Sequence, residues 1–282
     1  MGYRHIDEAW IYENEDEVGR ALEEKFAAGV VKREDVFVTS KLWNNFHRPE
    51  LVKQGVLESL AKLKLKSLDL FLVHFPVAFR PDVKEATAPE EVEDIPLEAT
   101  WRAMEALVDE GLVANIGVSN FEIEHLQKVQ AVAKRPIAVN QFETQPYYQR
   151  TALVQYCQAH GIVVTAHTSL GSPGNVMKTH HASPPLMQDP VVARVAAEVG
   201  RAPANVLLRW AVQRGTIVLP KSVTAARIAS NADVFSFELS DAQMAAISAL
   251  EKPGLEGCFN HPRTPWLGRG DFKPGNVAHY YQ

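Results

Sequence analysis

Short apolar runs alternate with stretches of helical periodicity along nearly the whole chain. The apolar runs are brief and rich in Val, Ile and Leu, which is typical of parallel strands covered on both faces. We therefore expect seven strands, at residues 3–6, 36–40, 68–73, 114–118, 137–140, 162–166 and 217–219.

Amphipathic helices are expected between these strands. In residues 17–26, for example, Val18, Ala21 and Leu22 fall on one helical face. The same spacing predicts helices at residues 50–64, 97–110 and 122–132, and a last helix to 250 that Ser240 caps.

The alternation of strand and helix predicts parallel strands joined by right-handed crossovers. A chain of 282 residues is long enough for two domains, but α/β barrels of this size form one unit. We therefore predict a single α/β barrel domain over residues 1–282, with 253–282 as a C-terminal tail near the barrel mouth. Residues 78–95, 171–189 and 253–282 lack periodicity and are expected to be loops.

The composition narrows the class of protein. Apolar residues make up 46% of the chain, and 29 Lys and Arg against 34 Asp and Glu give a net charge of -5. This charge argues against a nucleic-acid partner, and no apolar run suits a signal peptide or a membrane span. The two cysteines, Cys157 and Cys258, fit neither a disulfide framework nor a zinc motif. We expect a cytoplasmic protein without membrane or nucleic-acid partners, as a monomer or weak homo-oligomer.

Each predicted strand ends on a polar residue. In a closed parallel barrel these ends meet at one face, which holds the active site. The residues are Asp7, Lys41, His74, Ser119 with Asn120, Gln141, His167 and Lys221.

Four residues suit carbonyl chemistry: Asp7, Tyr12, Lys41 and His74. A phenol has a pKa of about 10, and a nearby ammonium lowers it. A carboxylate can hold the ammonium, and a histidine can donate a hydrogen bond to a carbonyl oxygen, so the group could combine a general acid with an oxyanion stabiliser. Each member also has a structural interpretation: Asp7–Lys41 as an ion pair between strands, Tyr12 as a half-buried aromatic and His74 as a core histidine.

Six separated motifs in this chain resemble those of the aldo-keto reductases. They are GYRHID at 2–7 with Tyr12, TSKLW at 39–43, LVHFP at 72–76, IGVSNF at 116–121, VNQ at 139–141, and LPKS at 219–222 with Arg227 and Asn231. The resemblance implies a (β/α)8 TIM barrel. It also implies that the protein uses NADPH to reduce the carbonyl group of an aldehyde or ketone, a class that includes sugars.

The resemblance also implies roles for single residues. Tyr12 would be the proton donor, Lys41 held by Asp7 would make its hydroxyl acidic, and His74 would orient the carbonyl. The cofactor would be held by Ser119, Asn120, Gln141, His167, Leu170, Ser172, Lys221, Ser222, Arg227 and Asn231. Lys221 and Arg227 suit a 2′-phosphate, which favours NADPH over NADH.

Aromatic residues near the expected barrel mouth suggest an apolar pocket for a small carbonyl substrate, although each also has an interpretation as core packing. They are Trp10, Trp43, Phe75 and Trp266.

Two features depart from the family pattern. His167 stands where the family usually has a tyrosine against the nicotinamide, so we expect weaker NADP+ binding below about pH 6.5, where imidazole is protonated. The chain also lacks the hairpin and first strand that the family carries ahead of the motif at Gly2. We expect an N-terminally truncated barrel with open edges at 3–6 and 217–219 and lower stability.

Two other functions stay open at this point. The chain could be a weakly active or regulatory NADPH-binding homologue, although an intact Asp7, Tyr12, Lys41 and His74 group argues against a pure binder. It could also be a metal-dependent barrel hydrolase that uses His5, Asp7, His74 and His167. We predict no metal, because Lys41 would compete with a cation there.

Overall fold

The computed structural model describes residues 1–172 and 185–260 of the chain, which divides into two compact units. The described part of the N-terminal unit is Tyr3–Asn140. The C-terminal unit comprises the described residues from Gln141 onward, together with Met1 and Gly2. The expectation of one domain stays a prediction.

The N-terminal unit is built on four parallel strands, adjacent in the order β1, β2, β3, β6. Strands that are adjacent in this sheet also follow one another in the chain, except that a short antiparallel pair lies between β3 and β6. A helix after each strand returns the chain, so that the next strand runs parallel to the one before it. The strands are β1 (His5–Asp7), β2 (Phe37–Leu42), β3 (Leu68–Val73) and β6 (Val113–Ser119).

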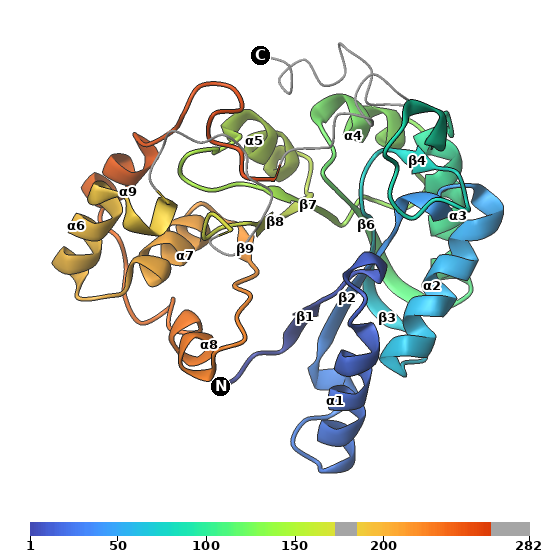
Figure 1. Ribbon diagram of the computed structural model, residues 1–282, viewed down its shortest axis with the longest axis horizontal. Helices are drawn as coiled ribbons and strands as arrows, with labels where there is room; N and C mark the ends of the chain where they lie inside the picture. Colours follow the sequence, from blue (N-terminus) through green and yellow to red (C-terminus); the bar gives the residue numbers. More distant parts are fainter. Residues whose placement is uncertain (173–184, 261–282) are drawn as a thin grey trace. The chain divides into compact units, whose positions relative to one another are not determined.

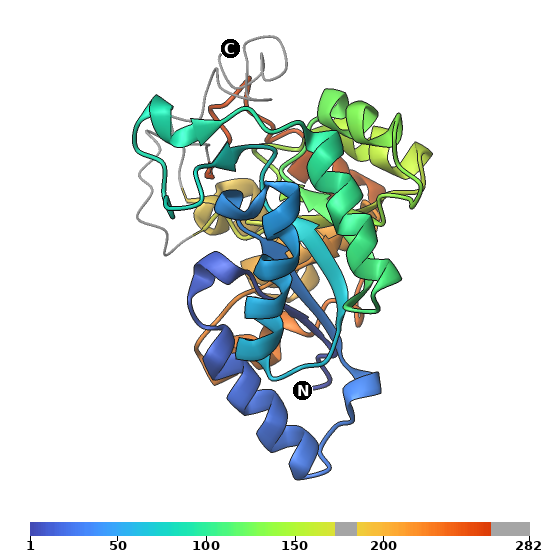
Figure 2. The same cartoon turned by 90° about the vertical axis from the view of Figure 1, so that its right-hand side faces the viewer.

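Helices cover one face of these strands, and each packs against the next along the sheet. Figures 1 and 2 show α1, α2 and α3 side by side along β1–β3. Gly19 permits the closest of these approaches, because a Cβ there would lie 2.2 Å from the Lys62 carbonyl oxygen. The helices are α1 (Glu15–Ala27), α2 (Pro49–Leu63), α3 (Leu97–Asp109) and α4 (Ile123–Gln130).

The stretch 78–95, expected to be a loop, contains a small antiparallel pair. Its strands are β4 (Ala78–Phe79) and β5 (Val92–Glu93), and an Arg48–Glu93 ion pair joins β5 to the start of α2. The expectation was wrong because a strand of two residues carries no readable alternation.

The C-terminal unit contains further strands of the same kind, with β8 parallel to β9. They are β7 (Val139–Glu143), which begins in the N-terminal unit, β8 (Val163–His167) and β9 (Ile217–Val218). The helices are α5 (Thr151–Ala159), α6 (Pro190–Val199), α7 (Pro203–Gln213), α8 (Ala225–Asn231) and α9 (Asp241–Ser248). A core around Val195, Leu207 and Trp210 joins α6, α7 and α9.

The expected strands and helices are all present, with ends that differ by a few residues, and the α/β class is confirmed. Ser240 caps the last helix, which ends at Ser248 rather than 250. The helices α5–α8 were not predicted from the sequence. In α7, every residue from Asn205 to Ala211 is buried, so no single apolar stripe marks the helix.

Five 3-10 turns complete the described structure: η1 (Trp10–Tyr12), η2 (Arg33–Asp35), η3 (Asn44–Phe46), η4 (Pro89–Glu91) and η5 (Leu186–Gln188). Among the helices of the described ranges, none is long and apolar enough to cross a membrane.

Candidate active site

The register of β1 on β2 brings polar side chains together on one face of the N-terminal sheet. His5 pairs with Phe37 and Asp7 with Thr39. Side chains alternate along a strand, so Asp7 shares a face with Thr39 and with Lys41 two residues further on. The register alone therefore brings the Lys41 ammonium to the Asp7 carboxylate.

Lys41 is the centre of this group, and its side chain is fully buried. Its Nζ donates to Asp7 Oδ1, to the Glu8 carbonyl oxygen at 2.9 Å and to the Tyr12 hydroxyl at 3.4 Å. Three acceptors satisfy the three donors of the ammonium, so the buried cation is fully hydrogen-bonded.

The surroundings of Lys41 keep it charged. Burial lowers the pKa of an ammonium, but the charge of Asp7 and the proximity of Tyr12 more than offset it, so the pKa of Lys41 lies above its ordinary value. Lys41 is therefore a permanent cation at neutral pH.

Tyr12 ends η1, directly before Glu13, which adopts a left-handed conformation with φ 58°. The Tyr12 side chain is 49% exposed, and its ring centroid lies 4.9 Å from Lys41 Nζ. The hydroxyl thus has a cation on its buried side while the ring remains accessible from solvent.

His74 lies directly after β3 and packs edge-on against the Tyr12 ring, with 5.9 Å between centroids. Its backbone N–H donates to the Leu42 carbonyl at 3.1 Å, and its carbonyl accepts from Asn120 Nδ2 at 2.9 Å. Asp7, Tyr12, Lys41 and His74 therefore meet, as the sequence analysis expected of a working site.

Aromatic side chains form an apolar wall beside His74. Phe75 stacks on the His74 ring at 5.1 Å, and Trp43 meets it edge-on at 5.0 Å. Trp43 is fixed by its Nε1, which donates to the Lys84 carbonyl at 2.6 Å, and it also contacts Phe79 of β4. Trp43 and Phe75 thus lie beside His74, and their role in substrate binding stays a prediction.

The other two aromatic residues predicted to bind substrate are Trp10 and Trp266. Trp10 contacts Phe46 at 5.2 Å, donates to Glu58 on α2 at 2.7 Å and has Lys84 Nζ 5.7 Å from its ring centroid. Its role in substrate binding stays a prediction. Trp266 lies outside the described residues.

Ser119 and Asn120 occupy the end of β6, close to His74. Asn120 Nδ2 donates to Ser119 Oγ at 3.1 Å as well as to the His74 carbonyl, and Asn120 has a φ of 60°. A non-glycine residue held at positive φ beside a cluster of polar groups suggests a functional turn.

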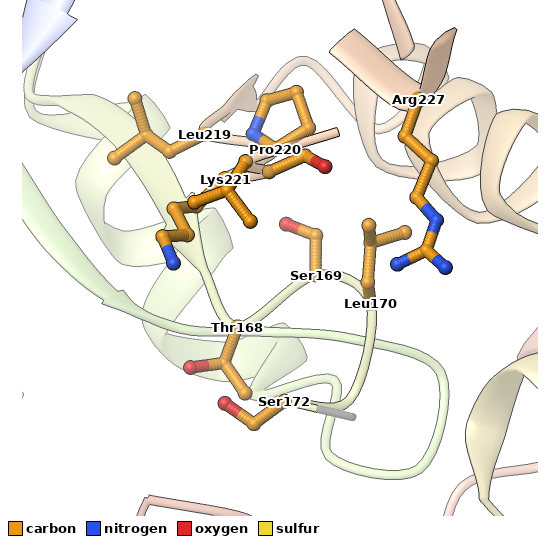
Figure 3. A pocket seen from close by; sticks show the side chains of 10 residues that line it. Thr168, Ser169, Leu170, Ser172, Leu219, Pro220, Lys221 and Arg227 are labelled. Carbon is orange, nitrogen blue, oxygen red and sulfur yellow. The ribbon is translucent and has the colours of Figure 1, made fainter. Parts of the chain in front are cut away.

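The C-terminal unit carries a cavity of about 530 Å³ between the loop after β8 and the segment after β9. Five of its lining residues are ones that the sequence analysis assigned to the cofactor: Leu170, Ser172, Lys221, Ser222 and Arg227. Figure 3 shows Lys221 and Arg227 on opposite sides of the hollow, with Ser169 and Leu170 between them.

Backbone geometry shapes the loop after β8. Thr168 and Ser172 have φ of 60° and 46°, and Gly171 closes a turn by donating to the Thr168 carbonyl at 2.8 Å. A Cβ at Gly171 would lie 2.9 Å from Leu186 Cβ. A β-branched residue at positive φ is costly, and such strain is concentrated at ligand sites.

Lys221 and Arg227 are exposed, and neither makes an ion pair with another residue of the described ranges. Two exposed cations that line one cavity suit a ligand with a multiply charged anionic group such as a phosphate. The cavity therefore fits the phosphate end of a nucleotide cofactor.

Five of the ten predicted cofactor residues do not line this cavity: Ser119 and Asn120 beside His74, and Gln141, His167 and Asn231. Gln141 is buried within β7, His167 ends β8 and bonds Thr168 Oγ1 at 2.8 Å, and Asn231 is buried at the end of α8. The strand-end expectation also needs correction, because Lys41 and Gln141 lie inside their strands and Lys221 lies beyond β9. The strands β1, β2, β7 and β8 start and end later than the predicted apolar runs, whereas β9 ends one residue earlier.

Several residues of both sites were not assigned a role from the sequence. Glu8 supplies a carbonyl to Lys41 and Lys84 supplies one to Trp43, while Thr168, Ser169 and Val223 line the cavity together with Leu219 and Pro220 of the LPKS motif. Backbone carbonyls leave no signal in residue types, but Thr168 and Ser169 directly follow a predicted strand and could have been found. No group of three His, Cys, Asp or Glu within the described residues is placed to hold a metal.

Comparison with known proteins agrees with this arrangement. Residues 1–252 match the model of the aldo/keto reductase family. The chain is 45% identical to rat aldo-keto reductase family 1 member A1 (89% of this chain, 79% of the relative) and 41% identical to rabbit prostaglandin-E(2) 9-reductase (94% and 85%). The structure of the aldose reductase from Schistosoma japonicum superposes with a TM-score of 0.82 at 38% identity, covering 94% of this chain and 86% of that one. The fold is therefore of the aldose reductase type.

Proposed function

This chain belongs to the aldo/keto reductase family, and we propose that it reduces an aldehyde or ketone to the alcohol with NADPH. The observation that carries the proposal is the buried Lys41 ammonium, which is held by Asp7 and donates to the hydroxyl of an accessible tyrosine. A structural ion pair alone would not need Tyr12 at that position.

NADPH would supply the hydride to the carbonyl carbon. The protein's part is to place a proton donor and to stabilise charge. As the carbonyl oxygen gains electron density, the Tyr12 O–H bond breaks and the proton passes to that oxygen. The Lys41 ammonium, 3.4 Å from the hydroxyl oxygen, stabilises the tyrosinate that remains. Because Tyr12 is 49% exposed, solvent can return its proton.

His74 would orient the substrate. Its ring is fixed between Phe75 and Trp43, so an imidazole N–H can donate to the carbonyl oxygen without losing rotational freedom on binding. The same aromatic side chains offer an apolar surface to the rest of the substrate, which favours aldehydes and ketones with an apolar substituent.

The predicted cofactor residues would bind different parts of NADPH, according to their charge and hydrogen-bonding groups. Lys221 and Arg227, both unpaired within the described chain, would bind the 2′-phosphate that distinguishes NADPH from NADH. Ser119 and Asn120 at the end of β6 offer hydroxyl and amide groups that suit the nicotinamide carboxamide.

The test is an assay of the purified chain with an aromatic aldehyde and either NADPH or NADH. We expect oxidation of NADPH with equal formation of alcohol, and a fall in kcat of roughly 10²- to 10⁴-fold in Tyr12→Phe, the usual range for loss of a general acid. Tyr3→Phe, at an exposed tyrosine of the same unit, should keep activity within about twofold. NADPH binding without turnover would instead favour a regulatory homologue.

A further inference from the structure

Two buried carboxyl side chains lie behind the Lys41 group, on the helix side of the sheet. Glu8 follows Asp7, and its backbone N–H continues the strand pairing by donating to the Thr39 carbonyl at 2.9 Å. Because side chains alternate, Glu8 is directed away from the face that Asp7 shares with Lys41. The Glu8 side chain is only 7% exposed, and its Oε2 finds no hydrogen-bond partner in the described chain.

Glu15 is the second carboxyl of this layer, at the first residue of α1. Its Oε1 accepts from Ser40 Oγ at 2.6 Å, while its Oε2 is buried without a partner among the described residues. Ser40 lies between Thr39 and Lys41 in β2, so it shares the helix-facing side with Glu8. Two carboxyl groups with spare buried oxygens therefore share one layer.

Glu8 is also tied to Lys41 directly, because its carbonyl oxygen accepts from Lys41 Nζ at 2.9 Å. The charged groups that act on the Glu8 carboxyl are Lys41 on β2, Asp7 on β1 and Glu15 on α1. Burial raises the pKa of Glu8 to about 7, with Lys41 lowering it and Asp7 and Glu15 raising it further. Glu8 thus changes charge in the range where the enzyme would work.

We propose that Glu8 is a positioning residue whose protonation sets the strength of the Lys41 field at Tyr12. With Glu8 neutral, the carboxylate that contacts the ammonium is that of Asp7. Ionised Glu8 adds a second negative charge and weakens the stabilisation that Lys41 gives to the tyrosinate. This inference rests on the proposed reduction and adds a pH control to it.

The sign of the effect follows from the charges. Reduction leaves Tyr12 as a tyrosinate, which a second carboxylate nearby destabilises. The rate of reduction should therefore be highest with Glu8 protonated and should fall, by roughly 3- to 10-fold, as the pH rises through about 7.

The first experiment compares pH profiles of kcat for aldehyde reduction. Glu8→Gln keeps the size of the side chain and should remove the step near neutral pH. Glu15→Gln removes a charge that raises the pKa of Glu8 and should move the step to lower pH. Glu17→Gln, an exposed carboxylate on the same helix, should leave the wild-type profile unchanged.

The second experiment needs neither substrate nor cofactor. A buried acid with a raised pKa stabilises the fold below its unfolded value, and this stability is lost as pH rises through the folded value. The melting temperature of Glu8→Gln relative to wild type should therefore rise between about pH 5 and 8. A Glu8 side chain that keeps one protonation state across this range would instead give a difference independent of pH.

The outcomes separate the two proposals. No turnover by wild type would overturn the proposed reduction while leaving the melting test informative. Turnover with the same pH step in wild type and Glu8→Gln, or a pH-independent melting difference, would overturn the role of Glu8. If Glu8→Gln does not fold, an unchanged step in Glu15→Gln would overturn it equally.

Discussion

Lys41 and Lys221 are the same residue in opposite settings. Lys41 lies in a strand, is fully buried and donates to three acceptors. Lys221 lies in the segment after β9, is exposed and has no ion pair within the described part of the chain. The first cation is already satisfied by the protein, whereas the second retains its full capacity for a ligand.

This difference shows how position in the fold separates the two tasks of a reductase. Strand register fixes the Asp7–Lys41 pair, and a fixed charge is what stabilisation of a reacting group needs. The cavity around Lys221 and Arg227 is formed mostly by loop residues, of which Thr168 and Ser172 have positive φ. Loops can present charge to solvent without a carboxylate partner, which leaves that charge accessible to a ligand.

The largest effect is expected from a variant that breaks the buried Asp7–Lys41 ion pair. Lys41→Met leaves the Asp7 carboxylate, whose side chain is 9% exposed, without its cation. Removing one partner of a buried ion pair usually costs about 3–5 kcal/mol, because the other charge stays buried. Urea denaturation monitored by tryptophan fluorescence would measure this loss in the free energy of unfolding.

A double variant provides the control for that prediction. Lys41→Met combined with Asp7→Asn leaves no unpaired charge and should be more stable than Lys41→Met alone. Equal stability of the single and double variants would mean that the pair is not the buried unit described above.

The next effect concerns the exposed cations. Lys221→Met with Arg227→Met should weaken NADPH binding by roughly 10- to 100-fold, since hydrogen bonds to charged groups are worth about 1.5–3 kcal/mol and solvent screens exposed ones. NADH binding and the free energy of unfolding should barely change. Fluorescence titration with both nucleotides measures this, and an equal loss for NADH would argue against a 2′-phosphate site.

The smallest expected effect is on the pH dependence of stability and comes from His47, a buried histidine of the N-terminal unit. His47 is buried, and burial lowers its pKa to about 3. A base with a lowered folded pKa favours the fold above its unfolded value, so the free energy of unfolding should fall below about pH 6.5, by at most about 1.4 kcal/mol per pH unit. Urea denaturation at several pH values should show this slope in the wild type. The control variant His160→Gln, at an exposed site, should keep the slope, whereas His47→Gln should show a smaller dependence of the free energy of unfolding on pH.

Three members of the group of Asp7, Tyr12, Lys41 and His74 were predictable from sequence because they lie at strand ends or close to them. Asp7, Lys41 and His74 follow or end apolar runs, so a parallel sheet was enough to bring them together. Lys221 and Arg227 required the family motif, since exposed basic residues are common and no periodicity distinguishes them. Glu8 was not predicted as a site residue, because a carboxylate that follows a strand is normally exposed to solvent.

The chain's pattern of apolar runs and polar strand ends determined the α/β class and the choice of Asp7, Tyr12, Lys41 and His74 as a group. Only the tertiary structure decided which charges are buried, which are paired and which stay open. Strand alternation is written into residue order, but burial and hydrogen bonding depend on distant segments that pack together, as Glu8, Glu15 and Ser40 do behind Lys41.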